Sequence, residues 1–93
     1  MNKIKLNKER IKIDKIDQQI FKLIKKRTNI VKKMISLKKY KHEIVDHKRI
    51  NEILLTLKRK SIRNKIDPKI TRRIWKSIIW SYVDFQRRNF KKK

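Results

Sequence analysis

The residues of this 93-residue chain with the clearest chemical potential are cations that interrupt apolar patterns. In one stretch of the chain, apolar residues recur every three or four positions, and Arg27 stands where the next apolar residue would be. Lys38 follows later in the same stretch. On a helix, this spacing puts the two side chains within about 20° of each other and roughly 16 Å apart along the axis. A cation in an apolar stripe is costly unless an anion meets it, so Arg27 and Lys38 could bracket a small anion.

Three further features add to this arrangement. Gln86 lies on the inward face of the last predicted helix. Asp46 and Arg49 lie three residues apart, a spacing at which the Asp46 carboxylate can pair with the Arg49 side chain and hold it in place. Arg10 lies about 25 Å before Arg27 along a helix and about 100° around it. Arg10 therefore cannot easily serve the same site within one chain, although it could serve a partner's site in an antiparallel dimer. A mostly cationic pocket with one amide and one acid suits a compact dicarboxylate that carries a hydroxyl group.

Each polar residue also has a purely structural explanation. Arg27 could extend out of the apolar stripe into solvent, or pair with Asp17 or Glu52. Lys38 could be one more solvated lysine, and Gln86 could lie at the edge of its stripe. Their joint arrangement is harder to explain in this way, and it favours a binding site.

Other catalytic arrangements are absent from the sequence. His42 and His47 have no nucleophile at a recognisable spacing, and the chain has no glycine for a phosphate-binding loop and no cysteine for a disulfide or thiolate zinc site. The few carboxylates are too scattered to suggest a metal site or an acid–base pair. We therefore expect no metal and no cofactor, and an enzyme built from this chain would act by electrostatics and positioning.

The formal net charge of +23 raises the possibility of a polyanionic partner. Lysine is spread through the whole chain, which favours solvent-facing helix positions over a dedicated nucleic-acid surface; a small basic helical nucleic-acid-binding protein is the competing interpretation. The N-terminal MNKIKLNKER lacks the features of a secretory signal, and no apolar run approaches the roughly 20 residues of a membrane span. We expect a cytoplasmic protein without membrane association.

The elements that must position these residues are predicted to be helices. We expect one all-α domain over residues 1–93, with three helices at about 8–39, 46–63 and 68–90. The first helix carries a coiled-coil-like seam of apolar residues, at Ile13, Ile16, Ile20, Leu23, Ile30, Met34 and Leu37. At about 45 Å it would be longer than a domain of this size, which favours a dimer that shares long helices.

The two later helices have clear start signals. Asp46 is an N-cap candidate for the second helix, a role that would explain this acid without any ligand. Asp67 followed by Pro68 is the clearest helix start in the chain. The third helix is expected to carry an apolar stripe formed by Ile70, Ile74, Ile78, Tyr82 and Phe85, with Trp75, Ile79 and Val83 beside it.

From about Lys8 to about Arg88, the sequence resembles the all-helical, class II chorismate mutases. The resemblance rests on Arg10, the segment IDKIDQQIFKLIKKR that ends in Arg27, Lys38, VDHKR with Asp46 and Arg49, DPKI, and Gln86. It implies an intertwined homodimer of three-helix chains with two active sites, each completed by an arginine from the other chain. It also implies the conversion of chorismate to prephenate in phenylalanine and tyrosine biosynthesis, without a cofactor.

The resemblance assigns a role to each site residue. The partner's Arg10 and Arg27 would bind the two substrate carboxylates with help from Arg49, and Asp46 would lie near the substrate hydroxyl. Lys38 and Gln86 would donate hydrogen bonds to the ether oxygen as the C–O bond breaks.

Two pocket positions depart from the family pattern. Ile50 stands where a glutamate is common, and Tyr82 stands where a small hydroxyl residue is common, although Ser81 is adjacent. The isochorismate-pyruvate lyases share this fold and keep the cationic set in a more apolar pocket, and they are the alternative enzyme class.

Overall fold

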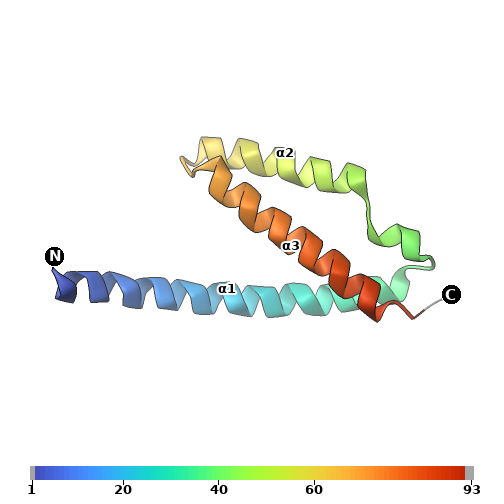
Figure 1. Ribbon diagram of the computed structural model, residues 1–93, viewed down its shortest axis with the longest axis horizontal. Helices are drawn as coiled ribbons and strands as arrows, with labels where there is room; N and C mark the ends of the chain where they lie inside the picture. Colours follow the sequence, from blue (N-terminus) through green and yellow to red (C-terminus); the bar gives the residue numbers. More distant parts are fainter. Residues whose placement is uncertain (1, 92–93) are drawn as a thin grey trace. The chain divides into compact units, whose positions relative to one another are not determined.

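The structure, a computed structural model, describes residues 2–91 as helical segments without a strand. The elements in chain order are α1 (Lys3–Leu37), the short 3₁₀ helix η1 (Lys41–Ile44), α2 (His47–Arg63) and α3 (Pro68–Asn89) (Figure 1). This result confirms the all-α prediction with three α-helices. The first helix begins before the expected residue 8 and ends at Leu37, and the expected connection after it contains η1.

The chain divides into two compact units, one up to Ile30 and the other from Val31 onward. The described part of the first unit is almost entirely α1. Its seam residues Ile13, Ile16, Ile20 and Leu23 are all exposed, and so are Ile30, Met34 and Leu37 further along the helix. The chain therefore leaves the apolar face that the sequence singled out uncovered.

The second unit has its own small core. α2 and α3 run antiparallel as a helical hairpin, and α3 also packs against η1 (Figure 1). The apolar residues buried among residues 2–91 all belong to this unit: Val31, Ile44, Ile79 and Val83. The core thus draws on the end of α1, on η1 and on the C-terminal half of α3.

The burial of apolar residues varies along α3. Ile79, Val83 and Gln86 share one helical face and are buried, whereas Ile70 and Ile74 are 54% and 48% exposed. Ile79 and Val83 were expected beside the stripe, and the stripe residues Ile78, Tyr82 and Phe85 are half-buried. In this unit the burial is concentrated at the end of α3 that lies near η1.

Side-chain caps set the helix starts in the second unit. The Asp46 carboxylate accepts from the Arg49 backbone N–H at 3.0 Å, and the Asp67 carboxylate accepts from the Lys69 N–H at 2.9 Å beside Pro68. Both caps were expected from the sequence. Each satisfies a backbone donor that a helix start would otherwise leave without a partner.

A buried hydroxyl fixes the turn between α2 and α3. Ser61, only 2% exposed, places its Oγ 2.7 Å from the Leu57 carbonyl oxygen and 2.7 Å from Thr71 Oγ1. Because Ser61 lies on α2 and Thr71 on α3, these contacts hold the two helices together at this end of the hairpin.

Within the described residues, no helix combines the length and apolar character that crossing a membrane requires.

Candidate active site

One side-chain hydrogen bond of the second unit joins two residues predicted for the site. Lys38 Nζ donates to Gln86 Oε1 at 2.8 Å, across 48 positions of sequence. Gln86 is only 7% exposed, and Lys38 is half-buried. Lys38 is held at the end of α1 because its backbone N–H donates to the Met34 and Ile35 carbonyl oxygens at 3.2 and 3.3 Å. The contact therefore brings the ends of α1 and α3 together.

The Lys38–Gln86 contact places further N–H donors of both side chains next to each other. The Lys38 ammonium has further N–H groups besides the one directed at Gln86, and the Gln86 side chain presents its NH₂ group because its oxygen accepts. A cation whose position is fixed by an amide stabilises negative charge that develops on a ligand oxygen.

The environment of Lys38 shifts its titration. Burial lowers the pKa of the Lys38 ammonium from its ordinary value of 10.5, and the nearby carboxylates of Glu43 and Asp46 partly oppose this shift. Desolvation is the larger effect, as expected for a lysine withdrawn from water. The effect of Glu43 and Asp46 on this pKa shows that both carboxylates lie near the Lys38 ammonium.

Asp46 and Arg49 lie at the same end of the unit, but not as the expected acid–base pair. The Asp46 carboxylate caps α2 through the Arg49 backbone N–H, and both side chains are exposed. The cap holds the acid at the helix start, close enough to Lys38 to affect its pKa. The Arg49 side chain lies on the first turn of α2, on the solvent side.

The two other arginines predicted for the site, Arg10 and Arg27, lie in the first unit. Arg27 is half-buried in α1, and Arg10 is exposed, with its Nη1 donating to Asn7 Oδ1 at 3.4 Å. Both belong to the continuous helix α1, so the roughly 25 Å between them along the axis still applies. Arg10 and Arg27 of one chain are therefore not brought together.

The two positions that depart from the family pattern are partly covered. Ile50 is half-buried on the first turns of α2. Tyr82 is half-buried on α3 and meets the Phe85 ring edge-on, with ring centroids 6.3 Å apart. Tyr82 lies one helical turn before Gln86, so the two share a side of α3.

Sequence reasoning missed two features of this region. Glu43 accepts from the Tyr40 backbone N–H at 3.2 Å, which fixes η1 and places a second carboxylate near Lys38. Its signal was an acid three residues after Tyr40, the spacing of a capping box. The second feature is a further face of α1, beside the seam, where Ile24, Thr28 and Ile35 are half-buried and Val31 is buried. This face has the helical spacing of three and four, but the longer seam obscured it.

No group of three or more His, Asp or Glu side chains that could hold a metal ion occurs among residues 2–91. The groups that the site offers are cations, amide donors and a capped carboxylate. Such groups bind an anionic ligand and stabilise charge on an oxygen.

Comparison with known families supports this chemistry. A family profile described as chorismate mutase type II matches residues 9–87, most of the chain. The chain belongs to this family. The match begins before Arg10 and extends beyond Gln86, and it supports chorismate mutase activity. No curated protein and no solved structure gives a significant match to the chain.

Proposed function

We propose that this chorismate mutase family member rearranges chorismate to prephenate at a site centred on Lys38 and Gln86. The observation that carries the proposal is the 2.8 Å hydrogen bond between these side chains in a chain of this family. In this rearrangement a C–O bond breaks as a C–C bond forms within one molecule, so no atom is gained or lost. The protein has only to bind the substrate in a reactive conformation and to stabilise charge.

The proposed roles follow from the charge of each group. Lys38 and the Gln86 amide donate to the ether oxygen, where negative charge develops as the C–O bond breaks. Because the cation is fixed before the reaction, it favours the transition state over the ground state. Asp46 faces the substrate hydroxyl, while Ile50 and Tyr82 line the site.

The substrate dianion requires more cations than Lys38. We assign its carboxylates to Arg27 and to the partner's Arg10, with Arg49 assisting. The length of α1 supports this division, because about 25 Å of helix separates Arg10 from Arg27 within one chain. The site is then complete only in a homodimer.

The exposed seam of α1 supports the dimer. All seven seam residues are exposed, and Leu37 is 79% exposed. A continuous apolar face of this length is unusual on a monomer and is typical of a helical interface. We propose an intertwined homodimer that acts in the cytoplasm, in the biosynthesis of phenylalanine and tyrosine.

The proposal is tested by incubating the purified chain with chorismate and, separately, with isochorismate. We expect prephenate from chorismate, and Lys38→Ala should lower kcat by about 10²–10³. The adjacent, exposed Lys39→Ala is the matched control and should retain activity. Full turnover by Lys38→Ala would contradict the assigned role, and pyruvate release from isochorismate without prephenate formation would identify a lyase instead.

A further inference from the structure

The positive charge of the second unit is concentrated at the turn between α2 and α3. Residues 58–76 contain nine cations and one acid, a net charge of +8, whereas residues 38–57 contain five cations and three acids, a net charge of +2. All nine cations are exposed, and we call them the cationic corner: Lys58, Arg59, Lys60, Arg63, Lys65, Lys69, Arg72, Arg73 and Lys76.

Little in this segment offsets the charge. Asp67 is its one acid, and the Asp67 carboxylate caps α3. The two ion pairs found among residues 2–91, Lys12–Glu9 and Arg88–Asp84, both lie outside the corner. A surface with so many exposed like charges attracts anionic groups from solution.

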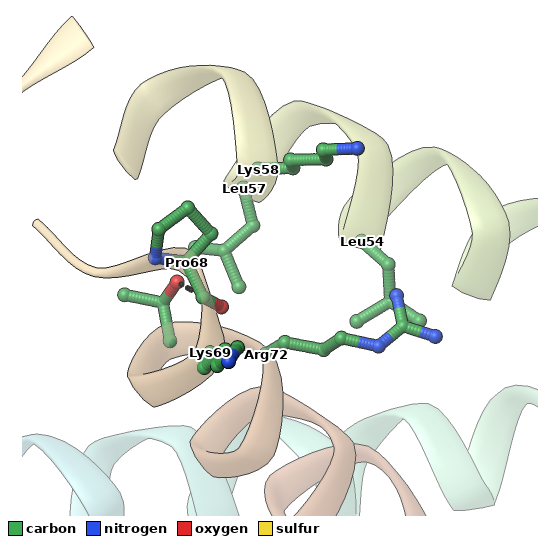
Figure 2. Close-up of a pocket in the computed structure, with 7 residues that line it drawn as sticks. Leu54, Leu57, Lys58, Pro68, Lys69 and Arg72 are labelled. Carbon is green, nitrogen blue, oxygen red and sulfur yellow. Dashed lines mark hydrogen bonds between the residues drawn. The ribbon is translucent and has the colours of Figure 1, made fainter. Parts of the chain in front are cut away.

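A pocket of about 160 Å³ opens within the cationic corner (Figure 2). Its apolar part consists of Leu54 and Leu57 from α2 and Pro68 from α3, all half-buried. Cations surround it, with Lys58 on α2 and Lys69 and Arg72 on α3. In Figure 2 the Arg72 side chain extends from α3 toward Leu54.

The size of the pocket sets what it can accept. An apolar cavity of about 150 Å³ holds a benzene-sized molecule. The pocket therefore has room for one branched aliphatic or aromatic group, and the cations around it favour acidic groups on either side of that group.

We propose that the cationic corner docks an acidic protein segment that inserts one aliphatic or aromatic side chain into this pocket. Acidic residues would pair with the exposed cations, while the apolar side chain would provide the anchor. Charged groups at such a rim direct association, and a buried anchor near the centre supplies affinity.

Two other occupants fit less well. At the cationic corner a second copy of this chain is disfavoured by charge, because residues 1–37, 38–57, 58–76 and 77–93 each carry a net positive charge, and the proposed homodimer uses the α1 seam instead. Nucleic acid would use the cations but not the apolar pocket. Single strands also favour aromatic side chains for base stacking, and the one aromatic residue of the 58–76 segment, Trp75, is half-buried and does not line the pocket.

The corner lies away from the proposed catalytic groups. Along α3, Lys69 and Gln86 are separated by about 25 Å. A segment bound at the corner would therefore leave Lys38 and Gln86 accessible. This surface gives the chain a binding function that the rearrangement of chorismate does not require.

The experiment measures binding of short, fluorescent peptides to the full chain by anisotropy. One peptide alternates Glu and Ser around a central Leu, and its control has Ala in place of Leu. We expect the Leu peptide to bind about tenfold more tightly, because only Leu fills the pocket. Equal affinities would overturn the proposed anchor.

A pair of charge reversals tests the location. Lys69→Glu with Arg72→Glu should weaken binding of the Leu peptide by about tenfold or more at low salt. The matched control, Arg87→Glu with Lys91→Glu, makes the same charge change at exposed positions near the other end of α3. An equal loss of peptide affinity in both variants would overturn specific binding at the cationic corner. Tighter binding of a single-stranded oligonucleotide of equal charge would overturn the choice of a protein segment.

Discussion

The apolar seam of α1 and the core of the second unit show opposite relations between pattern and burial. The seam has the most regular apolar spacing in the chain, yet all of its residues are exposed. The second unit has a less regular pattern, yet it buries Ile44, Ile79 and Val83 and holds Gln86 against Lys38. Regular apolar spacing thus predicts an amphipathic helix, and it does not say whether the same chain buries the apolar face.

The same difference divides the residues of the proposed site into two groups. The second unit positions Lys38, Gln86 and Asp46 through contacts within one chain. Arg10 and Arg27 instead lie on the helix whose apolar face is uncovered. Under the proposed function, damage to the seam should remove catalysis without altering the Lys38–Gln86 contact.

The largest expected effect comes from charging the seam. Ile16→Glu with Ile20→Glu should convert the dimer to monomers and lower chorismate turnover by about a thousandfold or more, because each site loses the partner's arginine. Analytical ultracentrifugation and a turnover assay measure the two results.

The control for the seam variant changes charge equally on the opposite side of α1. Gln18→Glu and Asn29→Glu lie about half a turn away from the seam. This control should remain dimeric and active. A seam variant that stays dimeric, or a monomer with full activity, would contradict the shared site.

Mixing two inactive chains tests which chain supplies Arg10. Arg10→Ala and Arg27→Ala should each be inactive, because each removes a carboxylate ligand. In a heterodimer, one of the two sites keeps both arginines, so an equal refolded mixture should recover about a quarter of normal activity. Absence of recovery in verified heterodimers would indicate that Arg10 does not act across the dimer.

The helical class could be predicted because apolar spacing and caps are local properties. Asp46 and Asp67 cap α2 and α3 as the sequence indicated. How deeply each apolar residue of α3 is buried depends on tertiary packing, so the sequence could not separate the buried Ile79 and Val83 from the exposed Ile70 and Ile74. The inward position of Gln86 was one of two open interpretations until its contact with Lys38 decided between them.

A smaller effect concerns the pH dependence of the second unit. Burial lowers the pKa of Lys38, so the unfolded chain keeps this proton to higher pH than the folded chain does. The free energy of unfolding should therefore rise as pH increases through the folded pKa. Catalysis needs the ammonium, so kcat/KM should fall over the same range, beginning below pH 10.5, the ordinary lysine value.

Arginine substitution separates Lys38 from other titrating groups. In Lys38→Arg the residual activity should lose this alkaline decline, because a guanidinium stays charged. Lys39→Arg, which alters an exposed neighbour, should keep it. An unchanged profile in Lys38→Arg would assign the decline to another residue.

The smallest expected effect lies at the turn that ends α2, inside the unit that packs on its own. Lys65 has a positive φ of 58°, and its N–H donates to the Ile62 carbonyl while Ile66 N–H donates to the Ser61 carbonyl. This is the Schellman geometry, in which glycine is preferred at the position of Lys65. Lys65→Gly should raise the free energy of unfolding by roughly 0.5–1 kcal/mol in thermal or urea unfolding at fixed protein concentration. Lys65→Ala removes the same charge but keeps Cβ, so it should give no such gain. An equal gain in both variants would instead point to relief of repulsion within the cationic corner.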